Sequence, residues 1–139
     1  MMTLGWNLSF NGQCEEAFRF YEECLGGTIK IMMTWGESPM AKDVPPDWAK
    51  KITHASLIIG NQELTGGDSP GPHFEKPQGF SVILNMTDSA EADRVFKVLS
   101  VDGKITVPLQ ETFWAARFGM VTDRFGIPWM INCGKSAES

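Results

Sequence analysis

The alternation of hydrophobic and polar residues predicts the same order of elements twice along the chain. In the first half, residues 4–10 alternate as a strand with one buried face does, and residues 14–25 place apolar side chains at helical spacing. Three further strands are expected over residues 29–35, 52–60 and 63–67. The first half therefore predicts the order βαβββ.

The second half predicts this order again. Its helix begins after Asp88, which forms a capping-box pattern with Glu91 three residues later. Its four strands are expected over residues 80–86, 104–112, 114–122 and 127–133. Gly60 and Gly126 lie between consecutive strands, where a tight turn favours glycine.

This repeat predicts the fold class and the place of function. Two half-units that each expose an apolar face bury it together, so we expect one α+β domain over residues 1–139, built from two tandem βαβββ modules at about 3–67 and 79–133. A cavity between the modules is the expected place for a binding site. The tail over residues 134–139 is expected to be disordered.

Composition and charge exclude several classes of function. The chain has 139 residues and a formal net charge of −5, with no run of Lys or Arg, so we expect no nucleic-acid partner. The three cysteines cannot all pair, and Cys14 and Cys24 would lie about 15 Å apart on one helix, so reduced thiols and a cytoplasmic location are predicted. No signal peptide or apolar span is recognisable, so no membrane partner is expected.

Strand parity predicts which side chains line the cavity. On each strand, every second side chain points away from the helix of its module. The side chains with this parity are Asn7, Ser9, Ser81, Ile83, Asn85, Met130 and Asn132. Amides and hydroxyls with two apolar side chains suit a small, partly polar ligand. The alternative is that these residues contact only water.

Glu63 shares this parity, and a carboxylate inside a cavity is costly unless it is paired or hydrated. Arg117, which is included among the candidate lining residues, and Lys30 are the possible partners. The alternative is that Glu63 is an edge-strand carboxylate in solvent.

Five tryptophans are many for a chain of this length. Trp6 and Trp129 lie on the helix-facing parity of their strands and are expected in the core. Trp35, Trp48 and Trp114 lie at strand ends or in a long loop, where contact with a ligand rim or a second subunit is the alternative to a core position.

The remaining reactive side chains do not form a catalytic pattern. His54 opens a predicted strand and is expected to form a structural hydrogen bond, and His73 lies in a loop and is expected to be solvated. Neither lies near a good nucleophile in the sequence. The cysteines are most simply small apolar residues. The catalytic residues, if there are any, are not predicted by the sequence.

Four segments, at residues 10–27, 54–60, 114–119 and 122–129, together resemble the PhnB-like branch of the vicinal oxygen chelate superfamily. This superfamily includes glyoxalase I, extradiol dioxygenases and bleomycin-resistance proteins. The resemblance covers nearly the whole chain. It implies a cup-shaped, partly open mixed sheet with the helices outside, and a homodimer.

The same resemblance implies where a divalent metal would bind. The superfamily uses His or Gln on the first strand of a module and Glu on the last. The matching positions here are Gly5 or Trp6, a position near Glu63, Ser81 and Met130. Only Glu63 is a metal-ligand type, and Zn, Ni or Fe sites need three or four good donors, so no metal cofactor is expected.

These observations predict a glyoxalase/bleomycin-resistance-like homodimer that binds a small molecule in its cup without the superfamily's metal. The alternative is a metal-dependent lyase, isomerase or dioxygenase-type enzyme, in which Glu63 acts with His54 or with residues of a second subunit. PhnB-like proteins are also named demethylubiquinone methyltransferases. We do not transfer that activity, because no strand is followed by the Gly-rich turn and helix that a nucleotide-like cofactor favours.

Overall fold

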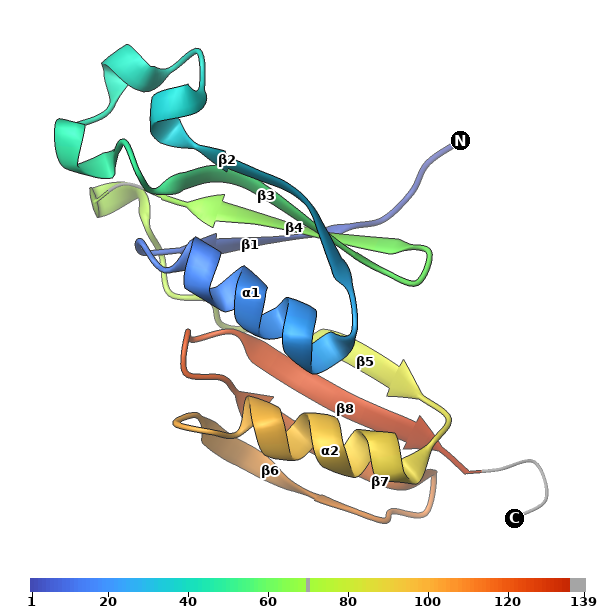
Figure 1. Cartoon of the computed structure of the whole chain (residues 1–139). Coiled ribbons are helices and arrows are strands. Elements are labelled where there is room, and N and C mark those ends of the chain that lie inside the picture. Colours follow the sequence, from blue (N-terminus) through green and yellow to red (C-terminus); the bar gives the residue numbers. More distant parts are fainter. Residues whose placement is uncertain (70, 136–139) are drawn as a thin grey trace. The chain divides into compact units, whose positions relative to one another are not determined.

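The structure is a computed structural model that describes residues 1–69 and 71–135. The chain divides into two compact units, Met1–Glu75 and Lys76–Ser139, and each unit is described by itself (Figure 1). The prediction that residues 134–139 are disordered is wrong for Gly134, which is the last residue of a strand. Residues 136–139 lie outside the described residues. That the whole chain forms one domain stays a prediction.

The described residues of the first unit form one α-helix, one four-stranded mixed sheet and several short 3₁₀ helices. The elements in chain order are β1 (Trp6–Phe10), α1 (Cys14–Leu25), β2 (Thr28–Thr34), β3 (Ile52–Ile59) and β4 (Gln62–Asp68). The strand order is β1-β4-β3-β2, with β1 parallel to β4 and the other pairs antiparallel. The connection from β2 to β3 holds three short 3₁₀ helices, η1 (Trp35–Glu37), η2 (Ala41–Asp43) and η3 (Pro46–Trp48), and η4 (Gly71–His73) follows β4.

The second unit repeats this topology. Its elements are β5 (Val82–Met86), α2 (Ser89–Leu99), β6 (Lys104–Gln110), β7 (Ala115–Thr122) and β8 (Pro128–Gly134). The strand order is β5-β8-β7-β6, and β5 is parallel to β8 as β1 is to β4. The predicted α+β class with two tandem βαβββ modules is confirmed.

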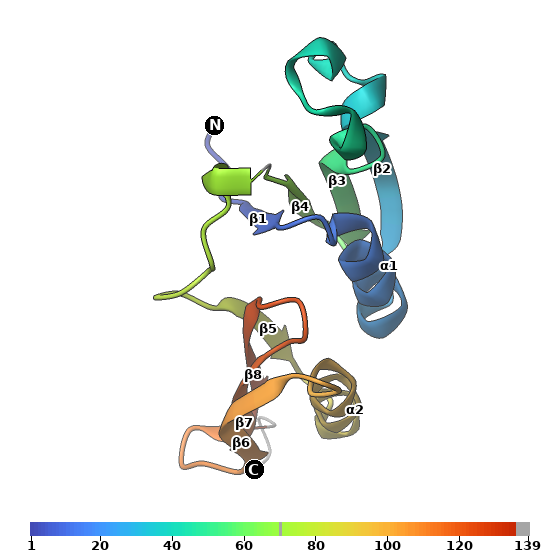
Figure 2. The same cartoon turned by 90° about the vertical axis from the view of Figure 1, so that its left-hand side faces the viewer.

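Each α-helix packs against one face of its own sheet (Figure 2). In the first unit Phe18 and Tyr21 of α1 are fully buried against this face. The approach is close at Gly66 of β4, where an added Cβ would lie 2.7 Å from the Phe18 ring. In the second unit Phe96 of α2 lies equally close to Gly119 of β7, at 2.9 Å from such a Cβ. We call the opposite face of each sheet its open face.

Most of the turns and helix caps predicted from the sequence occur in the structure. Gly60 and Gly126 adopt positive φ angles of 61° and 91° at the hairpin turns, as predicted. Asp88 caps α2 by accepting a hydrogen bond from the Ala90 backbone N–H at 3.0 Å. The predicted capping box is wrong in its second half, because the Glu91 carboxylate pairs with Arg94 instead of reaching back to the cap. Among the described residues, no helix has the length and apolar character needed to cross a membrane.

Buried carboxylates hold the loops of each unit. Asp68, at the end of β4, is 3% exposed and accepts hydrogen bonds from the backbone N–H groups of Gly12, Cys14 and Ile52, each at 2.9 Å. Asp123, after β7, is equally buried and accepts from two backbone N–H groups of the following turn and from the Trp129 indole. These contacts satisfy both carboxylates within the fold, so neither is left to bind a ligand.

Candidate ligand-binding site

The open face of the first unit carries a polar stripe along β1 and β4. Asn7 lies opposite Thr65 and Ser9 lies opposite Gly67 in the parallel pair. Leu8 between them is 2% exposed and faces the helix. The predicted parity of Asn7 and Ser9 therefore agrees with the register, while their role in ligand binding stays a prediction.

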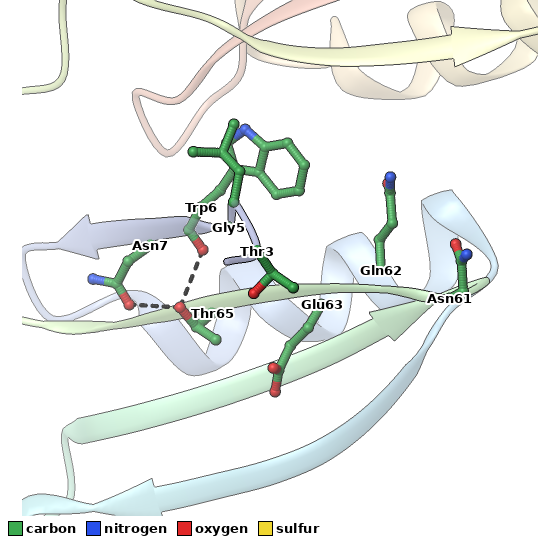
Figure 3. A pocket seen from close by; sticks show the side chains of 9 residues that line it. Thr3, Gly5, Trp6, Asn7, Asn61, Gln62, Glu63 and Thr65 are labelled. Atoms are coloured by element: carbon green, nitrogen blue, oxygen red, sulfur yellow. Dashed lines mark hydrogen bonds between the residues drawn. The ribbon is translucent and has the colours of Figure 1, made fainter. Parts of the chain in front are cut away.

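A hollow of about 400 Å³ lies where β1 and β4 begin (Figure 3). It brings together two predicted residues, Asn7 and Glu63. Its lining consists of Thr3, Leu4, Gly5, Trp6, Asn7, Asn61, Gln62, Glu63 and Thr65. Figure 3 shows that the Glu63 side chain extends to one side of β4, whereas Gln62 and Trp6 extend to the other. The prediction that Trp6 belongs to the core is wrong, because it lines this hollow and is only half-buried, while Trp129 is 1% exposed as predicted.

Sequence reasoning missed several lining residues of this hollow. Thr65 shares the parity of Glu63 on β4, so the alternation that selected Glu63 could also have selected it. Its hydroxyl lies 2.8 Å from Asn7 Oδ1 and 3.1 Å from the Trp6 carbonyl oxygen, so it connects β4 with the edge strand β1. Thr3 and Asn61 lie outside the strands, where the pattern carries no such signal.

A smaller hollow of about 210 Å³ shares the lining residue Asn7 with the first. Ser9, His73 and Trp35 contribute to its lining, so the expectation of a solvated His73 holds only in part, since His73 is exposed but faces a hollow. The Trp35 indole is held in place because its Nε1 donates to the Asp68 carbonyl oxygen at 3.1 Å. His54 lies opposite Met33 within the sheet and lines neither hollow.

Glu63 is hydrogen-bonded to a different residue from those predicted. The Ser56 hydroxyl donates to Glu63 Oε2 from a position that is 0% exposed, on the neighbouring strand β3. Arg117 and Lys30 are not its partners: within the described residues Arg117 pairs with Asp93, and no ion pair joins Lys30 to Glu63. Glu63 was predicted either to line a cavity or to be exposed to solvent. Each prediction is partly right, because the side chain is exposed and also lines a hollow.

Arg117 was also predicted to line the cavity, and this is wrong. Arg117 shares the parity of Gly119 and Val121 on β7 and lies opposite the buried Cys133. This is the helix-covered face, where Arg117 Nε donates to Asp93 of α2 at 2.9 Å. The alternation along β7 therefore carried the signal that Arg117 shares the helix-facing parity of Val121.

The open face of the second unit is more apolar than that of the first. Ile83 lies opposite Met130, and Met120 lies opposite Met130 on the next strand. At one end of this face the Asn132 amide donates to Asn85 Oδ1 at 3.2 Å. Ser81 directly precedes β5.

Aromatic side chains extend this apolar surface. Phe118, which sequence reasoning missed, lies opposite Asn132, and its ring centroid is 5.3 Å from that of Trp114. Phe113 packs on Trp114 at 4.7 Å and is 89% exposed. Trp48, the third tryptophan predicted at a rim, is half-buried at the end of η3 in the first unit.

The described residues do not fit a metal site. Within each unit, no group of three or more His, Cys, Asp and Glu side chains is close enough to hold an ion. Glu63 is the only candidate ligand at the positions that the superfamily resemblance implies, and one of its oxygens accepts from Ser56. A site of this kind needs three or four donors, so we derive no chemistry through a metal here.

The cysteines do not provide a nucleophile on the open faces. Cys14, Cys24 and Cys133 are all buried, and none forms a disulfide. Burial raises the pKa of the Cys14 thiol, and the carboxylates of Asp68 and Glu15 raise it further. Since the thiolate is the nucleophilic form, this thiol is unreactive at neutral pH.

The chain has a glyoxalase-like fold. A glyoxylase/bleomycin resistance protein/dioxygenase domain from Frankia sp. EAN1pec shares the fold, with a TM-score of 0.64 at 13% identity over 97% of this chain and 98% of that one. The chain matches the 3-demethylubiquinone-9 3-methyltransferase family over residues 3–132, and it belongs to that family.

Three proteins with higher sequence identity to this chain support the family assignment. Protein YjdN of Escherichia coli K12 is 37% identical over 144 residues, covering 96% of this chain and 97% of that protein. The crystal structure of PA1353 from Pseudomonas aeruginosa has a TM-score of 0.86 and 43% identity, covering 98% of this chain and all of that one. A PhnB protein from Bacillus cereus has a TM-score of 0.81 and 25% identity over 96% of this chain and all of that one. The predicted PhnB-like resemblance is confirmed.

Proposed function

We propose that the protein binds a small, partly polar molecule in the hollow formed by Asn7, Glu63 and Thr65, without a divalent metal. The observation that carries this proposal is the hollow itself. Its volume of about 400 Å³ falls within the roughly 300–1,000 Å³ typical of small-molecule sites. Three of its polar side chains, Asn7, Glu63 and Thr65, are held by hydrogen bonds to neighbouring strands, as a site that orients a ligand requires.

Binding is tested by titrating the ¹⁵N-labelled full chain with a panel of neutral, cationic and anionic fragments. We expect members of the panel to shift the amide signals of Asn7, Gln62 and Thr65 together, in a saturable manner. Thr65→Val keeps the side-chain shape but removes its hydroxyl, and should weaken this binding. Thr28→Val, at the exposed start of β2, is the matched control. A panel that leaves these three signals unmoved would overturn the proposal.

Metal independence rests on the donor set. The metal-dependent alternative, a lyase, isomerase or dioxygenase-type enzyme, would need Glu63 and at least two further donors. Native mass spectrometry after incubation with Zn²⁺, Ni²⁺, Mn²⁺ and Fe²⁺ separates the two functions. We expect the mass of the metal-free protein. One retained equivalent of metal that is lost in Glu63→Gln would favour the alternative.

The exposed rings on the second unit support a homodimer. Phe113 and Trp114 are 89% and 50% exposed and form a contiguous aromatic surface, which is a common feature of subunit contacts. We include self-association in the proposed function. A cytoplasmic location is proposed as well, on the ground that the three cysteines are all thiols.

A further inference from the structure

The lining of the larger hollow is electrostatically one-sided. Of its nine residues, Glu63 is the only one with an ionisable side chain. The lining contains no Lys, Arg or His, and the whole chain has a formal net charge of −5. Phosphates and carboxylates would therefore meet repulsion here without a compensating cation.

The Glu63 carboxylate is oriented by the protein but not neutralised by it. Ser56 donates to Oε2 from within the sheet, which fixes the carboxylate. Among the described residues no basic side chain pairs with Glu63, and Oε1 accepts no hydrogen bond. A fixed carboxylate oxygen of this kind can accept a short, charge-assisted hydrogen bond from a cationic donor.

The second hollow does not supply a competing negative group. It is lined by Asp68, but both carboxylate oxygens of Asp68 accept hydrogen bonds from backbone N–H groups. Glu63 is thus the carboxylate that the two adjoining hollows leave available. The neutral lining groups on the same face as Glu63, the Asn7 amide and the Thr65 hydroxyl, offer further oxygen acceptors.

We propose that the ligand of this hollow carries a protonated amine, which donates a hydrogen bond to Glu63 Oε1. The inference rests on the proposed function and narrows its ligand to cationic amines. A lone carboxylate suits an ammonium group, because the three ammonium donors can share one charged acceptor and neutral oxygens. It suits a divalent ion poorly, since such an ion needs several good donors.

The test compares three probes of similar size on the ¹⁵N-labelled full chain: n-butylammonium, 1-butanol and butyrate. We expect butylammonium to shift the Asn7, Gln62 and Thr65 amides at the lowest concentration, and butyrate to leave them unmoved. Glu63→Gln should weaken butylammonium binding about tenfold or more, as expected for a hydrogen bond to a charged group. Glu16→Gln makes the same charge change on the exposed face of α1 and should have little effect.

Ser56→Ala provides a second variant that keeps the charge. It frees the carboxylate from its orienting hydroxyl, and we expect a loss of butylammonium affinity smaller than that of Glu63→Gln. Butanol or butyrate binding as tightly as butylammonium would overturn the amine but leave the proposed function intact. An equal loss in Glu16→Gln and Glu63→Gln would also overturn it, because the effect would then be one of net charge. If no probe shifts the three amides, the amine proposal is overturned. The proposed function is overturned as well only if the wider fragment panel also leaves these amides unmoved.

Discussion

Ser56 and Glu63 are diagonal neighbours on the open face of the first sheet, because Ser56 pairs with Thr65 and Ile58 pairs with Glu63. The Ser56 hydroxyl is fully buried on β3, yet it donates to a carboxylate that is exposed at the mouth of a hollow. The fold therefore sets the direction of the one charged side chain that the hollow offers. The expected consequences for stability and assembly can be checked separately from ligand binding.

The first prediction concerns Asp68. In Asp68→Asn an amide nitrogen takes the place of one carboxylate oxygen. Because this nitrogen cannot accept a hydrogen bond, either the bonds from the Gly12 and Cys14 N–H groups or the bond from the Ile52 N–H group are lost. Because hydrogen bonds to a buried charged group are lost, we expect the free energy of unfolding to fall by about 2–4 kcal/mol. Urea denaturation measures this change. Asp47→Asn, at an exposed position in η3, should change it by less than about 0.5 kcal/mol. Equal effects of the two variants would contradict the role assigned to Asp68.

The second prediction concerns the contact between α1 and its sheet. In Gly66→Ala the new Cβ would lie 2.7 Å from the Phe18 ring and 2.8 Å from the Leu8 carbonyl oxygen. We expect a destabilisation of about 1–3 kcal/mol, because the overpacked helix must move away from the sheet. Gly134→Ala meets no atom within 4 Å and serves as the control in the same thermal or urea experiment. A neutral Gly66→Ala would show that the helix is packed more loosely than the structure indicates.

The third prediction is a dependence of stability on pH that arises from Cys14. Its pKa is raised in the folded protein above the ordinary value of 9.0, first by burial and then by Asp68 and Glu15. Stability from this shift is complete below pH 9.0 and is lost as the pH rises above it, because the unfolded thiol ionises there while the folded one stays protonated.

Equilibrium unfolding between about pH 9 and 11 measures this effect. The wild type should lose about 1.4 kcal/mol per pH unit more than Cys14→Ala at the upper end of this range. The comparison of slopes cancels the cost of the small cavity that the substitution leaves. Parallel slopes in the two proteins would show that the thiol ionises in the folded state.

The fourth prediction concerns self-association. Phe113→Ser removes the most exposed ring of the aromatic surface, so we expect the dissociation constant of the homodimer to rise about tenfold. Val101→Ser, at a position 52% exposed after α2, is the control. Sedimentation velocity over a concentration series gives the dissociation constant of the wild type and of each variant. A monomeric wild type, or the same constant in all three proteins, would refute the proposed interface.

The fold could be read from the sequence because its signals are local. Alternation marked the strands, helical spacing marked α1 and α2, and Gly60 and Gly126 marked turns that need positive φ angles. These signals act over a few residues and do not depend on what the strands pack against. The predicted capping box was wrong because the Glu91 carboxylate has another local partner, Arg94, with which it forms an ion pair.

The site could be predicted only in part. Parity selected Asn7 and Glu63 correctly for the open face, but the partner of Glu63 depends on the register between β3 and β4, which places Ser56 within reach. Arg117 was misplaced although the alternation along β7 gives it the helix-facing parity of Val121. The register between β3 and β4 follows from pairing between distant segments, and a single sequence carries little information about it.

The most direct test of the account is a crystal structure of the full chain grown with Zn²⁺ and soaked with n-butylammonium, with anomalous data collected at the zinc edge. The account predicts density for the amine within hydrogen-bond distance of Glu63 Oε1 and no anomalous peak in the hollow. An anomalous peak at about 2.0–2.2 Å from the Glu63 carboxylate, with further protein ligands around it, would contradict the account.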